Sequence, residues 1–512
     1  MQIIQRLTEH HAHIVLGDAG TSLLQCVMGL RPALHTLALE AKHPSVRSQS
    51  ALSLIAGAEQ DSSASFSVND ALFDGCSDVL TAAASFTQLR SLSLHSNWCP
   101  CPPTRVGEPQ CQDRQDRLQG VLSHLFEALG CSLQHIRFEC ALRPAAGAGM
   151  LNAISSLTKL SSIQFFGELA HVAPAEEFCS LVEGFAQLPA LRTLQLDSFQ
   201  FVNISGYRRA DHGAFVLLGH VCKSIAKLTT LTSLCMNCSI KMGASRLSEH
   251  AHFDVVRSLG IAMKPLNGLE SLELIDTLQG YATGSMLNSV LAHKSLLTRL
   301  VLECDSYLEI DDSFSDDAWN NPVLSNLKAL RELRVLGYSL EAKHASAIAG
   351  LNRLSKLELG GNINDAFWEV LGEKVPRMSC LKILNLRGCL LCRFLSRWAG
   401  GLHLAAPDAI PQLVKLELQC YSGYDEVTEW DTVLRSVTSL TALVLQFGQF
   451  GALQESTIKS LAGSISHMPR LKELSFSLRT GASAGSKLAL GEAAARCFGP
   501  DWETQAGVQL DV

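Results

Sequence analysis

The sequence has few charged and few aromatic residues, at 18% and 6% of its 512 positions. Hydrophobic residues make up 47%, which excludes a disordered chain, because such chains combine low hydrophobicity with high charge. No apolar run approaches the roughly 18 residues of a membrane span. The N-terminal residues lack the apolar core of a secretory signal. These absences predict a soluble, intracellular protein, which we place in the cytoplasm.

An excess of positive charge is also lacking. Lys and Arg total 42 against 49 Asp and Glu, so the net charge is -7. A mildly acidic chain has no general attraction to phosphate backbones, and we therefore expect no nucleic-acid partner. The 17 cysteines are odd in number and irregularly spaced, which favours reduced, buried thiols over a disulfide framework.

Motifs that carry catalysis are missing as well. The sequence contains no phosphate-binding Gly-x-x-x-x-Gly-Lys-Ser/Thr, no Gly-x-Ser-x-Gly and no His-Glu-x-x-His. Histidines such as His212, His220 and His250 have no partners at motif spacing. Without a convergent acid, base and nucleophile, no catalytic mechanism can be argued. We therefore expect no enzyme activity and no cofactor.

Two groups of cysteines have spacings that partly resemble a zinc site and a redox motif. His95, Cys99, Cys101 and Cys111 offer four soft ligands for zinc, but the usual two-residue gap between paired cysteines is missing, so a proline-rich loop is the alternative. The Cys-x-x-Cys that begins at Cys389 resembles a redox motif, yet no thioredoxin-like strand pattern surrounds it. We predict no metal site from either group.

What the sequence does contain is a recurring Leu-x-x-Leu-x-Leu pattern. Clear copies begin at Leu34, Leu89, Leu191, Leu231, Leu269, Leu297, Leu330, Leu354, Leu381, Leu413, Leu440 and Leu471, with degenerate copies at Leu133 and Leu160. From Leu231 to Leu471 the intervals range from 24 to 38 residues. The gap from Leu34 to Leu89 is 55 residues, and the segment around Leu52 suggests a decayed copy within it.

Each copy predicts a strand followed, before the next copy, by a helix. Side chains two apart share one face of a strand, so the leucines point to one side and the intervening polar residues to the other. Preceding segments show helical spacing, as for Ile458, Leu461 and Ile465. One such unit cannot bury its own apolar stripe, whereas stacked units form a continuous core.

This pattern resembles the leucine-rich repeat proteins, and the long units are similar to their ribonuclease-inhibitor-like class. The family's Asn or Cys after the strand is present at Asn97, Asn362 and Cys389. The resemblance implies an α/β fold: a leucine-rich repeat solenoid, or horseshoe, of about 14 repeats with a parallel inner sheet and outer helices. It implies little about function, because function depends on sites added to the scaffold.

The repeat also suggests a domain organisation. We expect an N-terminal cap over residues 1–30 and the solenoid over 31–480, irregular before about 190. Residues 481–512 lose the repeat, so we expect a C-terminal cap there, with a helix over Leu488–Phe498 and a mobile tail after Pro500.

The centres of the Leu-x-Leu cores should line the inner sheet. In successive units they are Arg137, Gln164, Gln195, Cys235, Glu273, Val301, Arg334, Glu358, Asn385, Glu417, Val444 and Ser475. Charge is mixed and aromatics are absent, unlike a nucleic-acid groove. Such a face fits either a protein partner or a merely solvated sheet.

Two acidic insertions follow strands four units apart, roughly 20 Å along the sheet at about 4.8 Å per strand. Exposed aromatics can anchor an interface and acids can steer a basic partner, so we predict that both insertions bind one protein that has a basic surface. The alternative is a solvated loop with its aromatics against the core. The predicted partner-binding residues are Tyr307, Glu309, Asp311, Asp312, Phe314, Asp316, Asp317 and Trp319, with Tyr421, Tyr424, Asp425, Glu426, Glu429 and Trp430.

The sequence thus favours a non-catalytic protein–protein interaction scaffold. The alternative is a regulatory accessory, because some proteins of similar repeat class activate small GTPases and others are substrate receptors of ubiquitin ligases. Arg105 is the arginine that we would test for the first role. The oligomeric state and the identity of the partner cannot be predicted from these residues.

Overall fold

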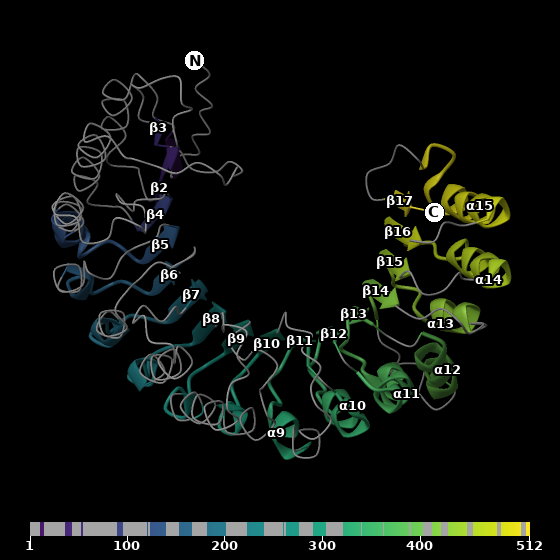
Figure 1. Ribbon diagram of the computed structural model, residues 1–512, viewed down its shortest axis with the longest axis horizontal. Helices are drawn as coiled ribbons and strands as arrows, with labels where there is room; N and C mark the ends of the chain where they lie inside the picture. The colour runs from purple at the N-terminus through teal and green to yellow at the C-terminus, as the bar shows by residue number, and fades with distance from the viewer. Residues whose placement is uncertain are drawn as a thin grey trace, which may run out of the picture. The chain divides into compact units, whose positions relative to one another are not determined.

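A computed structural model gives the structure of the chain (Figure 1). The residues that it describes are 11–14, 36–42, 53–54, 90–95, 120, 123–139, 153–165, 182–200, 223–239, 260, 263–275, 290–303, 321–338, 340–361, 363–388, 391–402, 412–420, 429–447, 454–478, 483–502 and 508–511. The chain forms two compact units, Met1–Leu269 and Glu270–Val512, and each is described here by itself.

The second unit contains a parallel sheet of consecutive strands. Each strand pairs in register with the next, so that Leu333 lies opposite Leu357 and Leu357 opposite Leu384. The strands are β9 (Ser271–Ile275), β10 (Arg299–Glu303), β11 (Glu332–Leu336), β12 (Lys356–Gly360), β13 (Ile383–Arg387), β14 (Lys415–Cys420), β15 (Ala442–Phe447), β16 (Glu473–Leu478) and β17 (Val508–Asp511).

Helices connect most of these strands and lie on one side of the sheet (Figure 1). They are α9 (Asn321–Asn326), α10 (Ala342–Ala349), α11 (Asp365–Lys374), the 3-10 helix η4 (Val375–Arg377), α12 (Leu391–Leu402), α13 (Trp430–Ser436), α14 (Glu455–Ile465) and α15 (Ala484–Phe498). A strand-to-parallel-strand connection through a helix on one face is the arrangement that the repeat predicts.

The leucines of the repeat form the core between sheet and helices. Leu357, Leu359 and Leu384 are completely buried, as are Phe367 and Leu371 of the facing helix α11. At about 25 cal/mol per Å² of buried apolar surface, each fully buried leucine contributes roughly 2 kcal/mol. The fold of this unit is therefore a leucine-rich repeat solenoid of the α/β class, as predicted.

A backbone ladder also joins the turns that lead from helix to strand. The Arg331 N–H donates to the Thr298 carbonyl, Ser355 N–H to Arg331, and Lys382 N–H to Ser355, each at 2.8 Å. The same bond continues from Val414 to Lys382 at 2.7 Å. Equivalent turn residues of successive repeats are thus held one strand spacing apart.

The first unit repeats the same plan. Its parallel strands are β1 (His11–Ile14), β2 (Thr36–Lys42), β4 (Ser91–His95), β5 (His135–Glu139), β6 (Ser162–Phe165), β7 (Thr193–Gln200) and β8 (Ser233–Ser239), paired in that order. Helical residues at 123–129, 153–155, 182–185 and 223–225 precede four of them. Buried leucines such as Leu160, Leu191 and Leu194 make the core.

Three local features differ from the sequence prediction. β1 forms a strand parallel to β2 within the expected N-terminal cap. β3 (Ser53–Leu54) pairs antiparallel with β2, and β2 pairs directly with β4, so Leu54 does not lie in a parallel repeat strand between them. The expected mobile tail includes β17, which pairs with β16 as one more parallel strand.

Helices α11 and α12 approach each other closely because each has a glycine where the two helices are in contact. A Cβ added at Gly372 would collide with the backbone oxygen of Phe394, and one added at Gly401 would lie 2.5 Å from the Glu373 oxygen. Gly400, one residue earlier in α12, has nothing within 4 Å of its Cβ position. The two contact glycines therefore set the distance between the helices.

Alanine at these helical glycines should have opposite effects. Gly372→Ala is expected to lower the free energy of unfolding by about 1–3 kcal/mol, because backbone must move. Gly400→Ala is expected to raise it by about 0.5–1 kcal/mol, because alanine favours helix and meets no neighbour. Urea unfolding of both variants measures this, and a stabilising Gly372→Ala would contradict the helix contact.

Lys294 occupies a position that other repeats fill with an apolar residue. The turn bond from Leu297 N–H to the Lys294 oxygen matches those from Leu330 to Leu327 and from Leu354 to Leu351. Lys294 is 1% exposed, and burial lowers the pKa of its ammonium group to about 8. Burial thus disfavours the charged form of this side chain, and we expect an apolar residue of similar size to stabilise the repeat near neutral pH.

Lys294→Met should raise the free energy of unfolding by about 1–2 kcal/mol near neutral pH. Below pH 8 both folded and unfolded wild-type chains are protonated, and the folded chain bears the full cost of the buried charge. Between pH 8 and about 10.4 the unfolded chain binds more protons than the folded one, so wild-type stability rises and the advantage of methionine disappears.

Urea unfolding across this pH range tests the prediction. The control is Lys328→Met, at an exposed lysine in the next turn, which should leave the pH dependence unchanged. A difference between Lys294→Met and wild type that does not vary with pH would contradict the assignment.

Candidate functional site

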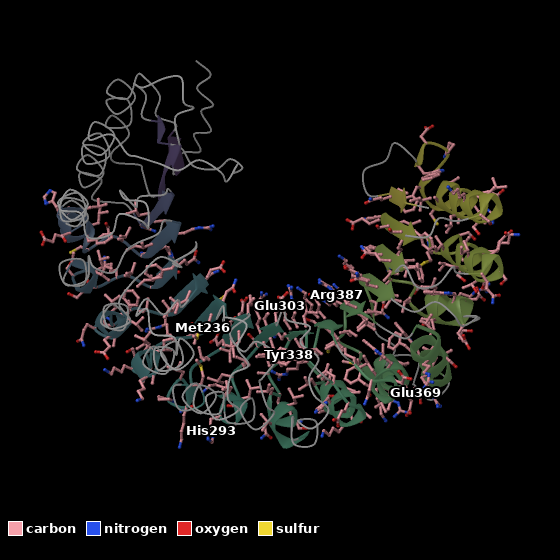
Figure 2. The ribbon with its side chains drawn as sticks, in the orientation of Figure 1. Met236, His293, Glu303, Tyr338, Glu369 and Arg387 are labelled. Carbon is pink, nitrogen blue, oxygen red and sulfur yellow. The ribbon has the colours of Figure 1, made fainter. Side chains whose placement is uncertain are left out.

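The face of the second unit's sheet that is opposite the helices carries the polar residues of the repeat. First, third and fifth residues of each strand lie on this face, whereas the buried second and fourth residues point to the core. Figure 2 shows Glu303 and Arg387 on this side and Glu369 on the helical side. This polar strand face of β9–β16 is the candidate site.

Ion pairs join neighbouring strands across the first part of this face. Arg299 Nε is 3.1 Å from Glu273 Oε1 on β9, and Arg299 Nη1 is 2.8 Å from Glu332 Oε2 on β11. Burial disfavours the guanidinium charge, but these two carboxylates more than compensate and raise the pKa of Arg299. One arginine thus links three strands.

A second set of ion pairs crosses β10 to β13. Arg334 Nη2 is 2.8 Å from Glu303 Oε2, and Arg387 Nη2 is 2.7 Å from Glu358 Oε1. Arg334 Nε is 3.8 Å from the same Glu358 oxygen, too long for a hydrogen bond. Glu358 therefore receives two guanidinium groups, one on each side.

The centre of the face is buried despite its polar composition. Glu358 is 5% exposed and Asn385, directly opposite it on β13, is 8% exposed. The Arg334 Nε and Asn385 Oδ1 atoms are buried without a hydrogen-bond partner. Charged groups that are desolvated and paired in this way are fixed in position, which costs free energy but defines the pattern presented to a partner.

Beyond β14 the third and fifth positions of the face are neutral, and Glu473 at the first position of β16 is the one charged residue of the face on β15 and β16. These third and fifth positions on β15 and β16 are Val444, Gln446, Ser475 and Ser477. Lys415 and Glu417 of β14 form the last ion pair before this region, at 3.0 Å. The face thus has a charge-paired part on β9–β14 and a mainly uncharged part on β15–β16.

Most of the predicted partner-binding residues lie outside the described residues. These are Tyr307, Glu309, Asp311, Asp312, Phe314, Asp316, Asp317, Trp319, Tyr421, Tyr424, Asp425 and Glu426. Glu429 is described and is partly exposed in the turn before α13.

Trp430 corrects the prediction, because its side chain is completely buried in α13. It packs in the core beside the fully buried Val433 of the same helix and does not reach the surface. For this residue the alternative of an aromatic against the core is the one that the structure shows. An indole contributes a large apolar area to a core, which accounts for its position.

The ion pairs across strands were not identified from the sequence. The prediction considered only the central residue of each strand, whereas Arg299, Glu303, Glu332 and Arg387 are first or fifth residues. An alignment of the repeats places opposite charges at equivalent or adjacent positions of neighbouring strands, because the parallel register is constant.

The described residues contain neither a grouping of metal ligands nor a helix that could span a membrane. Within the described ranges, no three or more His, Cys, Asp or Glu residues are grouped so that they could hold a metal ion. Cys99, Cys101 and Cys111 lie outside those ranges. Of the helices that the structure describes, none is both long and apolar enough to cross a bilayer.

Comparison with known proteins adds little beyond the fold. No protein family matches the sequence. No curated protein matches it. A solved structure titled "Crystal structure of TLR13-ssRNA13 complex" is similar at 16% sequence identity and a TM-score of 0.33, over 84% of this chain and 65% of that chain. This chain thus spans 65% of the length of the matched chain, and the likeness does not bear on what it binds.

Removing the central carboxylate should be more costly than removing a peripheral one. Glu358→Gln leaves two guanidinium groups next to a neutral amide, and we expect a loss of about 1–2 kcal/mol of unfolding free energy. Glu332→Gln is the matched control, because its ion pair with Arg299 is more than 40% exposed on both sides. It should cost less than about 0.5 kcal/mol.

Urea unfolding at low and high salt measures both variants. Equal losses for the two would contradict a special role of the buried Glu358.

Proposed function

We propose that this chain is a non-catalytic scaffold that binds a protein partner on the polar strand face of β9–β16. The observation that carries the proposal is the asymmetry of the sheet. One face is covered by helices and its leucines are completely buried, whereas the other bears ordered charged and polar groups that no element of the second unit's described residues covers. A stack of repeats that leaves one face uncovered is suited to contact with another molecule.

The ion pairs support binding because they hold charged side chains before a partner arrives. Ordering a long side chain on binding costs roughly 0.5–1.5 kcal/mol, and a side chain already held by a neighbour avoids part of that cost. The charges on β9–β14 balance: Glu273, Glu303, Glu332, Glu358 and Glu417 against Arg299, Arg334, Lys356, Arg387 and Lys415. A partner on this face therefore needs a mixed polar surface rather than one sign of charge.

The acidic segments that follow β10 and β14 extend the proposal. Their Asp, Glu and aromatic residues, Trp430 excepted, would add steering and anchoring contacts for a partner with a basic surface. The proposed repeat subclass is the ribonuclease-inhibitor-like one. It is supported by α10, α11 and α12, which are 8, 10 and 12 residues long and return the chain between neighbouring strands.

A face-directed pair of substitutions tests the proposal. Gln446→Arg with Ser475→Arg places two large cations on the mainly uncharged part of the face, where both side chains are partly exposed. The matched control, Ser460→Arg with Gly463→Arg, adds the same two positive charges at exposed positions of α14. We expect proteins that co-purify with the wild-type full chain to be lost at least tenfold with the face variant and kept with the control.

Quantitative mass spectrometry of nuclease-treated purifications provides the measurement. Identical co-purifying proteins for all three chains would contradict binding on this face. Material that disappears on nuclease treatment would indicate a nucleic acid instead of a protein.

The regulatory alternative has no support from the described residues. Arg105, the arginine considered for action on a GTPase, lies outside them. Activation of a small GTPase and substrate reception for a ubiquitin ligase therefore stay predictions from the family resemblance.

A further inference from the structure

A cluster of basic residues lies on the turns that lead into β11, β12 and β13. Lys328 and Arg331 precede or begin the first of these strands, Arg353 and Lys356 the second, and Arg377 and Lys382 the third. We call these six residues the basic turn cluster. It lies at the edge of the sheet where the strands begin, and only Lys356 also belongs to the polar strand face.

The cluster is exposed and unneutralised. Five of its residues are exposed and Lys356 is half-buried. In the part of the chain that the structure describes, none of the six side chains forms an ion pair or a hydrogen bond. The turn segments 327–331, 350–355 and 375–382 contain no Asp or Glu. The neighbouring acid Glu332 is already engaged by Arg299 at 2.8 Å.

Helix ends explain only part of this charge. A cation in the last turn of a helix interacts favourably with the helix dipole, which accounts for Arg377 at the end of η4. The effect fades within one turn. Arg331, Arg353 and Lys382 lie beyond it, at the start of the strands, where the fold requires no charge.

The backbone ladder of the turns fixes the spacing of the cluster. Arg331 and Lys382 occupy equivalent positions two repeats apart, joined through Ser355 by two hydrogen bonds of 2.8 Å. Two strand spacings amount to roughly 10 Å, which is about the rise over three residues of an extended polyproline II segment, where residues three apart lie on the same side. Arg353 lies on the repeat between them.

We propose that the basic turn cluster binds an extended acidic segment of a protein partner. Carboxylates three residues apart in such a segment would meet Arg331 and Lys382, with Arg353 between, through charge-assisted hydrogen bonds. This interface differs in place and in charge from the acidic segments after β10 and β14, and it goes beyond binding on the strand face.

The composition of the turns favours a protein segment over other polyanions. Residues 327–331, 350–356 and 375–382 contain no Phe, Tyr or Trp on which nucleic-acid bases could stack. The three turns of the cluster contain no exposed large hydrophobic residue, but Leu296 and Val414, on the flanking turns into β10 and β14, are exposed, so a membrane surface is tested as a separate outcome. The chain as a whole is also acidic, with a net charge of -7.

The test uses fluorescence anisotropy to measure how the full chain binds a fluorescein-labelled peptide of about twelve residues that repeats Glu-Gly-Ser, so that its carboxylates are three residues apart. Arg331→Gln/Arg353→Gln/Lys382→Gln should weaken binding about tenfold or more. The control, Lys472→Gln/Lys487→Gln/Arg496→Gln, removes the same charge from exposed positions on β16's turn and on α15, and should change binding less than about twofold. A peptide with Gln in place of Glu should not bind.

Further arms use an RNA of about twenty uridines and vesicles that contain phosphatidylserine. Equal weakening by the two triple variants, or no binding of the acidic peptide, would overturn the proposal. The proposal would also be overturned if the RNA or the vesicles bound more tightly than the peptide and if the cluster variant lost that binding. Because none of the three substituted residues is on the polar strand face, co-purification through that face can persist when this proposal fails.

Discussion

The whole architecture depends on the burial of one leucine-bearing strand face against a layer of helices. Single repeats cannot achieve this, because a strand of five or six residues and one helix leave their ends open to water. In the second unit the parallel register is constant from β9 to β16, so every repeat presents its leucines at the same height as those of its neighbours. The opposite face then inherits the same regularity, and polar side chains line up in rows without any further interaction being needed.

Those rows are where the chemistry of the surface arises. Arg299, Arg334 and Glu358 each meet partners on neighbouring strands, because first, third and fifth residues are repeated at one strand spacing. At the edge of the sheet where the strands begin, the same stacking of repeats brings Arg331, Arg353 and Lys382 close together, and the turn segments that carry them contain no acidic residue. Two surfaces with different electrostatic character thus derive from one repeat.

Much of the fold could be predicted from the sequence, because the Leu-x-x-Leu-x-Leu pattern determines both the strand and its buried face. The pairings of β2 with β4 and of β16 with β17 could not, since Leu52 lies in an alternating apolar segment that imitates a repeat and Val508–Asp511 lacks the leucine pattern. The buried state of Trp430 was also missed. An aromatic next to acidic residues resembles an exposed anchor until the helix that carries it is placed against the core. The ion pairs could be predicted only with the strand register, because they join residues about 30 positions apart in the sequence.

Lys294 has a consequence for how the stack comes apart. In a linear array each repeat is supported only by the repeats beside it, so the least stable member determines where cooperative opening begins. Burial lowers the pKa of Lys294 to about 8, so we expect this repeat to gain stability as the pH rises above 8, unlike repeats with leucine at the same position. Local opening at this repeat should then become less frequent between pH 8 and about 10.4, where the unfolded chain binds more protons than the folded one.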